Sequence, residues 1–178
     1  MTDGQAGGDS PSQQALFDQA VRAYGPALQR LTHAYEAIAD RRADLLQEIY
    51  LALWQSLRMF DGRCALGTWV YRVAHNTATS VSIRKRDRLR LIGLDDIELA
   101  AEPPNVGKAI DEARARSRLL ELIHGLKPLD RQIVQLYLEG LEAAAIGDIV
   151  GLSAANVATK IHRLKKVLAQ QFQEEGRR

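Results

Sequence analysis

Residues 142–166 read EAAAIGDIVGLSAANVATKIHRLKK, a stretch that combines a short apolar helix, a turn and a longer amphipathic helix. Gly151 suits the left-handed residue of a tight turn, and Ser153 is positioned to cap the N-terminus of the next helix. The apolar residues of the longer helix fall on a single stripe, which is formed by Val157, Ile161, Leu164, Leu168 and Phe172. The sequence therefore predicts two helices that meet at a fixed angle, a helix-turn-helix.

The outer side of this longer helix is polar and basic. Small and amide residues at its start can approach base edges in the major groove, while basic residues further along can meet phosphates. The candidate DNA-contacting residues are Ser153, Ala155, Asn156, Thr159, Lys160, His162, Arg163 and Lys166. The alternative is an ordinary helical hairpin whose charges are only solvated and do not bind DNA. For His162 the alternative is a surface histidine that contacts no base.

The chain upstream is also helical in its pattern. From residue 14 to residue 91 the apolar residues recur at helical spacing, with no alternating stretch long enough to indicate a sheet. One predicted helix runs through residues 44–57, and a break with Gly62 precedes a second long helix. That second helix ends in a basic run that contains Arg84, Lys85 and Arg86. We expect an all-α protein.

The pattern divides the chain into two small helical domains, residues 14–92 and residues 108–173. Between them, residues 93–107 are acidic and contain Pro103-Pro104, which prevents a continuous helix. Residues 1–13 are rich in Gly, Ser, Asp and Gln and read as a disordered tail. We expect two helical bodies held apart by a flexible acidic linker, with the helix-turn-helix in the second.

Composition excludes several classes of function. The net charge of +2 over 178 residues does not by itself indicate a nucleic-acid partner, so the clustering of charge matters more. A single cysteine, Cys64, excludes an internal disulfide, and the four histidines are too scattered for a metal site. No stretch approaches the roughly 18 apolar residues of a membrane span. We expect a cytoplasmic protein with no cofactor, no metal and no membrane contact of its own.

Two blocks of sequence resemble the extracytoplasmic-function (ECF) sigma factors of bacterial RNA polymerase. The first block comprises DLLQEIYLALW at residues 44–54, FDG at 60–62 and TWVYRVAHN at 68–76, and it resembles sigma region 2. The second begins with IGDIVGLS at residues 146–153 and resembles region 4. The resemblance covers nearly all of the chain except the first dozen residues and the linker.

The resemblance implies a function in transcription initiation and a set of partners. Region 2 of the family lies against the clamp helices of the polymerase's largest subunit, and the matching residues here are Asp44, Gln47 and Glu48. Their polar, acidic edge beside an apolar stripe suits a basic partner. Contact of region 4 with the polymerase flap and restraint by an anti-sigma factor are further expectations from the family.

The family also implies two promoter contacts. Region 4 would read the minus-thirty-five element as duplex, and region 2 would capture an unstacked base of the minus-ten element. An aromatic face can stack on such a base and an amide can read its edge, while basic residues anchor phosphates. The matching minus-ten candidates are Phe60, Trp69, Arg72, Asn76, Arg84, Lys85 and Arg86. For Phe60 and Trp69 core packing is the competing role.

Three positions depart from the family pattern and bear on promoter specificity. Ser80 stands where many relatives carry an acid, Gly147 where alanine is common, and Ala158 where a basic residue is frequent. Other readings are a stand-alone helix-turn-helix transcriptional regulator and a polymerase-binding protein without promoter activity. We do not expect an enzyme, because no nucleophile, base and orienting partner are grouped and no phosphate-cradling glycine loop is present.

Overall fold

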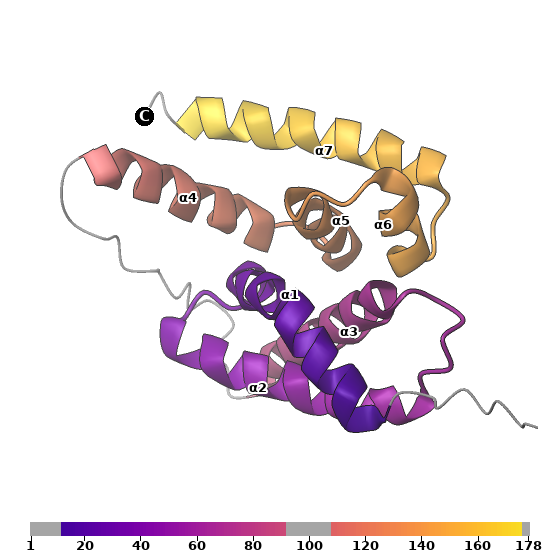
Figure 1. Ribbon diagram of the computed structural model, residues 1–178. Helices are drawn as coiled ribbons and strands as arrows, with labels where there is room; N and C mark the ends of the chain where they lie inside the picture. Colours follow the sequence, from indigo (N-terminus) through magenta and orange to yellow (C-terminus); the bar gives the residue numbers. More distant parts are fainter. Residues whose placement is uncertain (1–11, 92–107, 176–178) are drawn as a thin grey trace, which may run out of the picture.

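The computed structural model of the chain describes residues 12–91 and 108–175, and every regular element in these ranges is a helix (Figure 1). The elements are α1 (Gln13–Tyr35), α2 (Ala39–Ser56), the short 3-10 helix η1 (Leu57–Met59), α3 (Leu66–Leu91), α4 (Lys108–His124), α5 (Pro128–Leu138), α6 (Ala143–Val150) and α7 (Ala154–Glu175). The all-α fold class is confirmed. The predicted acidic linker and nearly all of the predicted tail lie outside the described residues.

Helices α1, α2 and α3 form the first module around an apolar core. Leu28, Ile49 and Val70 are fully buried, one from each helix. The helical spacing of large apolar residues explains this arrangement, because each helix presents one stripe to the other two. Helix α1 begins at Gln13, where the Ser12 hydroxyl accepts a hydrogen bond from the Ala15 N–H at 3.2 Å. A polar cap of this kind fixes the start of the helix.

Helices α4 to α7 form the second module, which has its own apolar centre. Ile133, Ile146 and Val157 are fully buried and come from α5, α6 and α7. Pro128 opens α5, because its missing N–H is not needed in the first turn of a helix. The first helix of the predicted helix-turn-helix is observed as α6, which begins at Ala143.

The turn between α6 and α7 has the predicted left-handed residue. Gly151 has a φ of 76°, and its N–H donates to Gly147 O at 2.8 Å. A Cβ at position 147 would lie only 2.5 Å from Leu152 O, so the close approach of the turn to α6 requires glycine here. Ser153 Oγ accepts from the Asn156 N–H at 3.3 Å, at the start of α7. The helix-turn-helix is confirmed in its turn geometry and its cap.

The two modules lie in direct contact. Helix α1 packs against α4 and α5, and α3 packs against α6, with the second module lying across α1 and α3 (Figure 1). The expectation of two bodies held apart is therefore not met in this conformation. Asn76 and Arg163 are both exposed, so the contact does not enclose them in a shared cavity. None of the described helices has an apolar stretch long and uncharged enough to cross a membrane.

Candidate nucleic-acid interface

Helix α7 presents the predicted reading face to solvent. Val157 and Leu164 are 0% and 4% exposed and anchor the inner side of the helix. With this side fixed, the outer side carries six exposed candidates: Ala155, Asn156, Thr159, His162, Arg163 and Lys166. Ser153 is also exposed at the start of the helix. An exposed helix with amides first and cations later can enter a major groove without rearranging its own core.

Asp130 holds two basic residues of α7, and sequence reasoning missed it. Its carboxylate is 2.8 Å from Lys160 Nζ and 3.6 Å from a terminal guanidinium nitrogen of Arg163. Asp130 lies in the first turn of α5, where a negative charge is also favoured by the helix dipole. Lys160 is therefore at the inner edge of the face and ties α7 to α5, whereas the Arg163 side chain remains 63% exposed.

The aromatic candidates of the first module pack on one another. The rings of Phe60 and Trp69 lie edge to face with centroids 5.5 Å apart, and Trp69 Nε1 donates to Ser56 Oγ at 3.0 Å. Both rings are half-buried, so each retains some surface for a ligand. Ser56 fixes the indole from α2, a partner that no sequence motif indicated. The pair forms a supported aromatic surface of the kind on which a base can stack.

Arg72 and Asn76 extend this surface along α3. Both residues are exposed, and with Trp69 they occupy one edge of the helix. Asn76 also lines a shallow groove between α2 and α3, together with Glu48, Leu51 and Arg84. Arg72 points to the second module: its Nε donates to Ile149 O at 3.3 Å, and a terminal nitrogen donates to Asp148 O. One predicted DNA contact is thus occupied by the end of α6.

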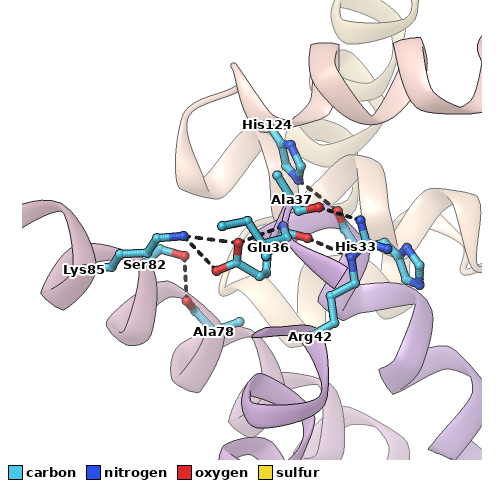
Figure 2. Close-up of polar contacts among 9 residues, drawn as sticks. His33, Glu36, Ala37, Arg42, Ala78, Ser82, Lys85 and His124 are labelled. Atoms are coloured by element: carbon cyan, nitrogen blue, oxygen red, sulfur yellow. Dashed lines mark hydrogen bonds and ion pairs between the residues drawn. The ribbon is translucent and has the colours of Figure 1, made fainter. Parts of the chain in front are cut away.

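The basic residues further along α3 have carboxylate partners within the first module. Arg84 pairs with Glu48 at 3.0 Å on the surface. Lys85 Nζ lies 2.8 and 3.1 Å from the two carboxylate oxygens of Glu36, whose side chain is only 9% exposed (Figure 2). Burial acts to raise the pKa of Glu36, but the hydrogen bonds from Lys85 and from the Ile38 N–H, together with the positive charges of Lys85 and Arg41, outweigh it and lower that pKa.

Glu36 belongs to a junction at the C-terminus of α1 (Figure 2). Arg42 donates from Nε to Glu36 O at 3.0 Å and from a terminal nitrogen to Ala37 O at 2.7 Å. His124 Nε2, from α4 of the second module, lies 2.8 Å from His33 O. Cationic and N–H groups therefore satisfy the carbonyls at the negative end of the helix dipole. Burial lowers the pKa of His124. The side chain of Arg86 lies outside the described residues.

The predicted polymerase-binding residues share one exposed edge of α2. Asp44, Gln47 and Glu48 are all exposed, while Leu45 and Ile49 on the opposite side are buried. The structure thus brings these three polar residues together and leaves them accessible, with Glu48 also bound to Arg84. In the described part of the chain, no three His, Cys, Asp or Glu side chains are grouped so that they could hold a metal ion.

Comparisons with known proteins agree with the two-module division of the sequence. The chain matches the family Sigma-70 region 2 over residues 20–89 and the family Sigma-70, region 4 over residues 116–168. Among known relatives, RNA polymerase sigma factor NccH of Alcaligenes xylosoxydans xylosoxydans is 26% identical, and the match covers 90% of this chain and 88% of the relative. ECF RNA polymerase sigma-E factor of Escherichia coli K12 is 27% identical, with 93% and 91% covered.

Two solved structures share the fold. CnrH in complex with the cytosolic domain of CnrY aligns with a TM-score of 0.62 at 21% identity, over 92% of this chain and 90% of CnrH. The sigma factor RpoE in complex with the anti-sigma factor NepR, from Bartonella quintana, aligns with a TM-score of 0.66 at 19% identity, over 89% and 96% of the two chains. These alignments support the helical architecture described above.

Proposed function

Since the chain belongs to the ECF sigma factors, which bind core RNA polymerase and direct initiation at specific promoters, we propose that it reads a minus-thirty-five element with α7 and a minus-ten element with α3. Sigma factors are non-catalytic, so the free energy of binding, and not a chemical step, would drive promoter melting. The observation that carries the proposal is the exposed amide and basic face of α7 on a buried apolar backing. The polymerase, and with it this chain, would work in the cytoplasm.

The minus-thirty-five contact is proposed for the N-terminal half of α7. Asn156 can make a bidentate contact with adenine, and Arg163 and Lys166 are placed to meet bases or phosphates. Ser153 and Ala155 at the start of the helix allow close approach to the groove wall. Lys160 would act chiefly through Asp130, by holding α7 on α5, because its ammonium group is turned toward that carboxylate.

The minus-ten contact is proposed for the surface formed by Phe60, Trp69, Arg72 and Asn76. A flipped base would stack on the exposed parts of the aromatic pair, and the Asn76 amide would meet its edge. Unpairing a base costs a few kcal/mol, about what stacking and hydrogen bonding of the captured base return. Melting would then be driven by binding. The backbone of the same strand would meet the basic end of α3.

The polymerase contact is proposed for the acidic edge of α2. Asp44, Gln47 and Glu48 project from one side of a helix whose other side is core, so the edge is rigid. A rigid acidic edge favours a basic partner by electrostatic complementarity, which raises the association rate more than it raises the affinity. The second module would contact the flap. The structurally similar RpoE is in complex with the anti-sigma factor NepR, and CnrH is in complex with the cytosolic domain of CnrY, so an anti-sigma factor is also proposed for this chain.

The proposal is tested with purified core polymerase. We expect Asp44→Arg to weaken core binding at least tenfold and to abolish run-off transcription from the DNA upstream of the gene for this chain. Asp18→Arg is the matched control, because Asp18 is an exposed acid on α1, away from the α2 edge. Absence of binding between the unaltered chain and core polymerase would reject the function. A stand-alone regulator would instead bind a duplex site tightly without polymerase.

A further inference from the structure

An acidic residue of α5 lies beside the reading face of α7. Helix α5 packs against α7 (Figure 1), and Asp130 in its first turn has a side chain that is only 12% exposed. Its Oδ1 lies 2.8 Å from Lys160 Nζ, and its Oδ2 lies 3.6 Å from a terminal nitrogen of Arg163. A negative charge at this place opposes the approach of phosphates. The effect of Asp130 on DNA binding therefore differs from its effect on the stability of the module.

The Asp130 carboxylate is held in a fixed position. Arg131 donates from Nε to Ile123 O and from a terminal nitrogen to Leu126 O, both at 3.2 Å, which ties the start of α5 to the end of α4. Ile133, one turn further along α5, is fully buried in the core of the module. An aspartate side chain has only two torsions, so a fixed backbone leaves its carboxylate few positions. The carboxylate can therefore orient a longer side chain that lies next to it.

The two cations meet this carboxylate in different ways. The half-buried Lys160 makes a short hydrogen bond to Oδ1, which joins α7 to α5. The exposed Arg163 lies beyond hydrogen-bond distance from Oδ2, so the contact attracts its guanidinium without using one of the N–H donors. Such an exposed ion pair adds little stability. Its effect is on where the guanidinium lies, and all donors of Arg163 stay available to a ligand.

Orientation of this guanidinium favours one kind of DNA contact. An arginine side chain loses much rotamer freedom when it binds, and a side chain that is already oriented loses less. The planar guanidinium fits the O6 and N7 atoms of guanine in the major groove with two parallel hydrogen bonds. The negative charge of Asp130 meanwhile weakens the attraction of Arg163 to phosphates of any sequence. Specificity is the difference between the two affinities, so both effects increase it.

We propose that Asp130 is a positioning residue for promoter specificity: it holds the guanidinium of Arg163 for a guanine of the minus-thirty-five element and does not itself touch the DNA. The inference rests on the proposed function of α7 and adds to it the base that Arg163 reads. Without the carboxylate, Arg163 still binds DNA, but it prefers that guanine less.

The positioning role is tested with holoenzyme assembled from core polymerase and the full chain. The DNA is the region upstream of the gene for this chain, with the minus-thirty-five element randomised, and the bound fraction is sequenced. Asp130→Asn keeps the size of the side chain and should lower the preference for guanine at one position roughly three- to tenfold. Its affinity for a duplex of random sequence should not fall, as it would in a misfolded module. Asp130→Glu should restore most of the preference. Glu121→Gln, at an exposed acid on α4, is the control and should change neither quantity.

The assignment to Arg163 is tested by a double-mutant cycle. Arg163→Ala should lose the same preference at the same position, and adding Asp130→Asn should then lower it no further. Lys160→Met breaks the tie between α5 and α7 but leaves Asp130 beside Arg163, so it should retain most of the preference. A preference that survives Asp130→Asn, or that Lys160→Met removes equally, would overturn the positioning role. Unaltered holoenzyme that selects no upstream element at all would instead overturn the proposed function of α7.

Discussion

The two proposed DNA surfaces differ in how far their polar groups are already engaged. On α3, Arg72, Arg84 and Lys85 each have a partner within the protein. On α7, the side chains of Asn156 and Lys166 are exposed and make no hydrogen bond to the rest of the described chain. Binding of DNA to α3 must therefore replace contacts at three of its candidates, whereas on α7 the contacts to be replaced are those of Lys160 and Arg163 with Asp130.

The helices also differ on their inner sides. Helix α7 is anchored by Val157 and Leu164, which are apolar. Helix α3 is anchored in part by His75, which is 1% exposed and lies with Nδ1 3.0 Å from Tyr35 Oη. Its Nε2 is buried and has no hydrogen-bond partner in the described part of the chain. A buried polar group of this kind lowers stability, so we expect the stability of the first module to depend on the charge of His75.

The largest expected difference between the two helices is in the effect of acid on stability. Burial lowers the pKa of His75 from 6.5 to about 3, so His75 is neutral in the folded state and takes up a proton on unfolding below about pH 6.5. The contribution of His75 to the free energy of unfolding is fully present above that pH. It falls as the pH decreases, by up to about 1.4 kcal/mol per pH unit for this group. Both tryptophans lie in the first module, so their fluorescence during urea unfolding reports the loss between pH 7 and pH 5.

The matched variant for this prediction is His75→Gln, which cannot take up a proton near neutral pH. It should unfold more easily at pH 7, where the histidine is well packed, and its stability should fall less between pH 7 and pH 5 than that of the unaltered chain. The loss that remains belongs to His33 and His124, whose pKa values burial also lowers. An unaltered chain with a flat profile over this range would show that His75 does not stay neutral in the folded protein.

The turn of the second module should be the next most sensitive point. Gly147→Ala places a Cβ 2.5 Å from Leu152 O, so backbone must move, at a cost of about 1–3 kcal/mol. The displaced turn should weaken duplex binding by α7 as well, which fluorescence anisotropy with minus-thirty-five DNA would measure. Gly125→Ala is the control, because its nearest contact would be an ordinary 3.5 Å and the variant should change stability little. Equal behaviour of the two variants would refute the steric account.

The ion pairs of α3 and its neighbours should differ in strength according to burial. Glu36→Gln leaves the ammonium of Lys85 beside a neutral amide at a largely buried site, and we expect a loss of about 1–2 kcal/mol. Glu48→Gln removes the partner of Arg84 on the surface and should cost under about 0.5 kcal/mol. Urea unfolding of both variants measures the difference. A larger loss for Glu48→Gln would reverse this ranking.

The smallest effects should appear in binding without loss of stability. Lys166→Ala should change the free energy of unfolding by less than about 0.5 kcal/mol, because the side chain is exposed. It should lower affinity for duplex DNA severalfold and reduce the slope of log affinity against log salt by about 1, as expected for one lost phosphate contact. Gln170→Ala, an exposed neutral residue of the same helix, should leave that slope unchanged.

The sequence predicted features that depend on local chemistry. The left-handed turn at Gly151 and the Ser153 cap follow from residues within a few positions of one another, and both are confirmed. The apolar stripe of α7 follows from helical periodicity in the same way, because Val157 and Leu164 are buried. Phe172, predicted on the same stripe, is 36% exposed. The exposure of the proposed contact residues of α2 and α7 could be predicted, because these residues lie on the side of each helix opposite its apolar stripe.

The contacts that the sequence could not supply join residues far apart in the chain. Asp130 holds Lys160, Glu36 holds Lys85, and Glu139 holds Arg30, across separations of 30, 49 and 109 residues. Nothing in local spacing selects one carboxylate among the 22 acidic residues as the partner of a given cation. The contact between the two modules could not be predicted either, because it depends on how the surfaces of the two folded modules fit together.

The most direct test of promoter recognition in two parts is footprinting of promoter DNA with and without core polymerase. We predict protection of the minus-thirty-five and minus-ten elements together, with unpaired bases at minus ten, only when both proteins are present. Asn76→Ala should reduce the minus-ten reactivity and leave the upstream footprint in place. Equal, sequence-specific protection of both elements by the chain alone would contradict a sigma factor that acts through polymerase.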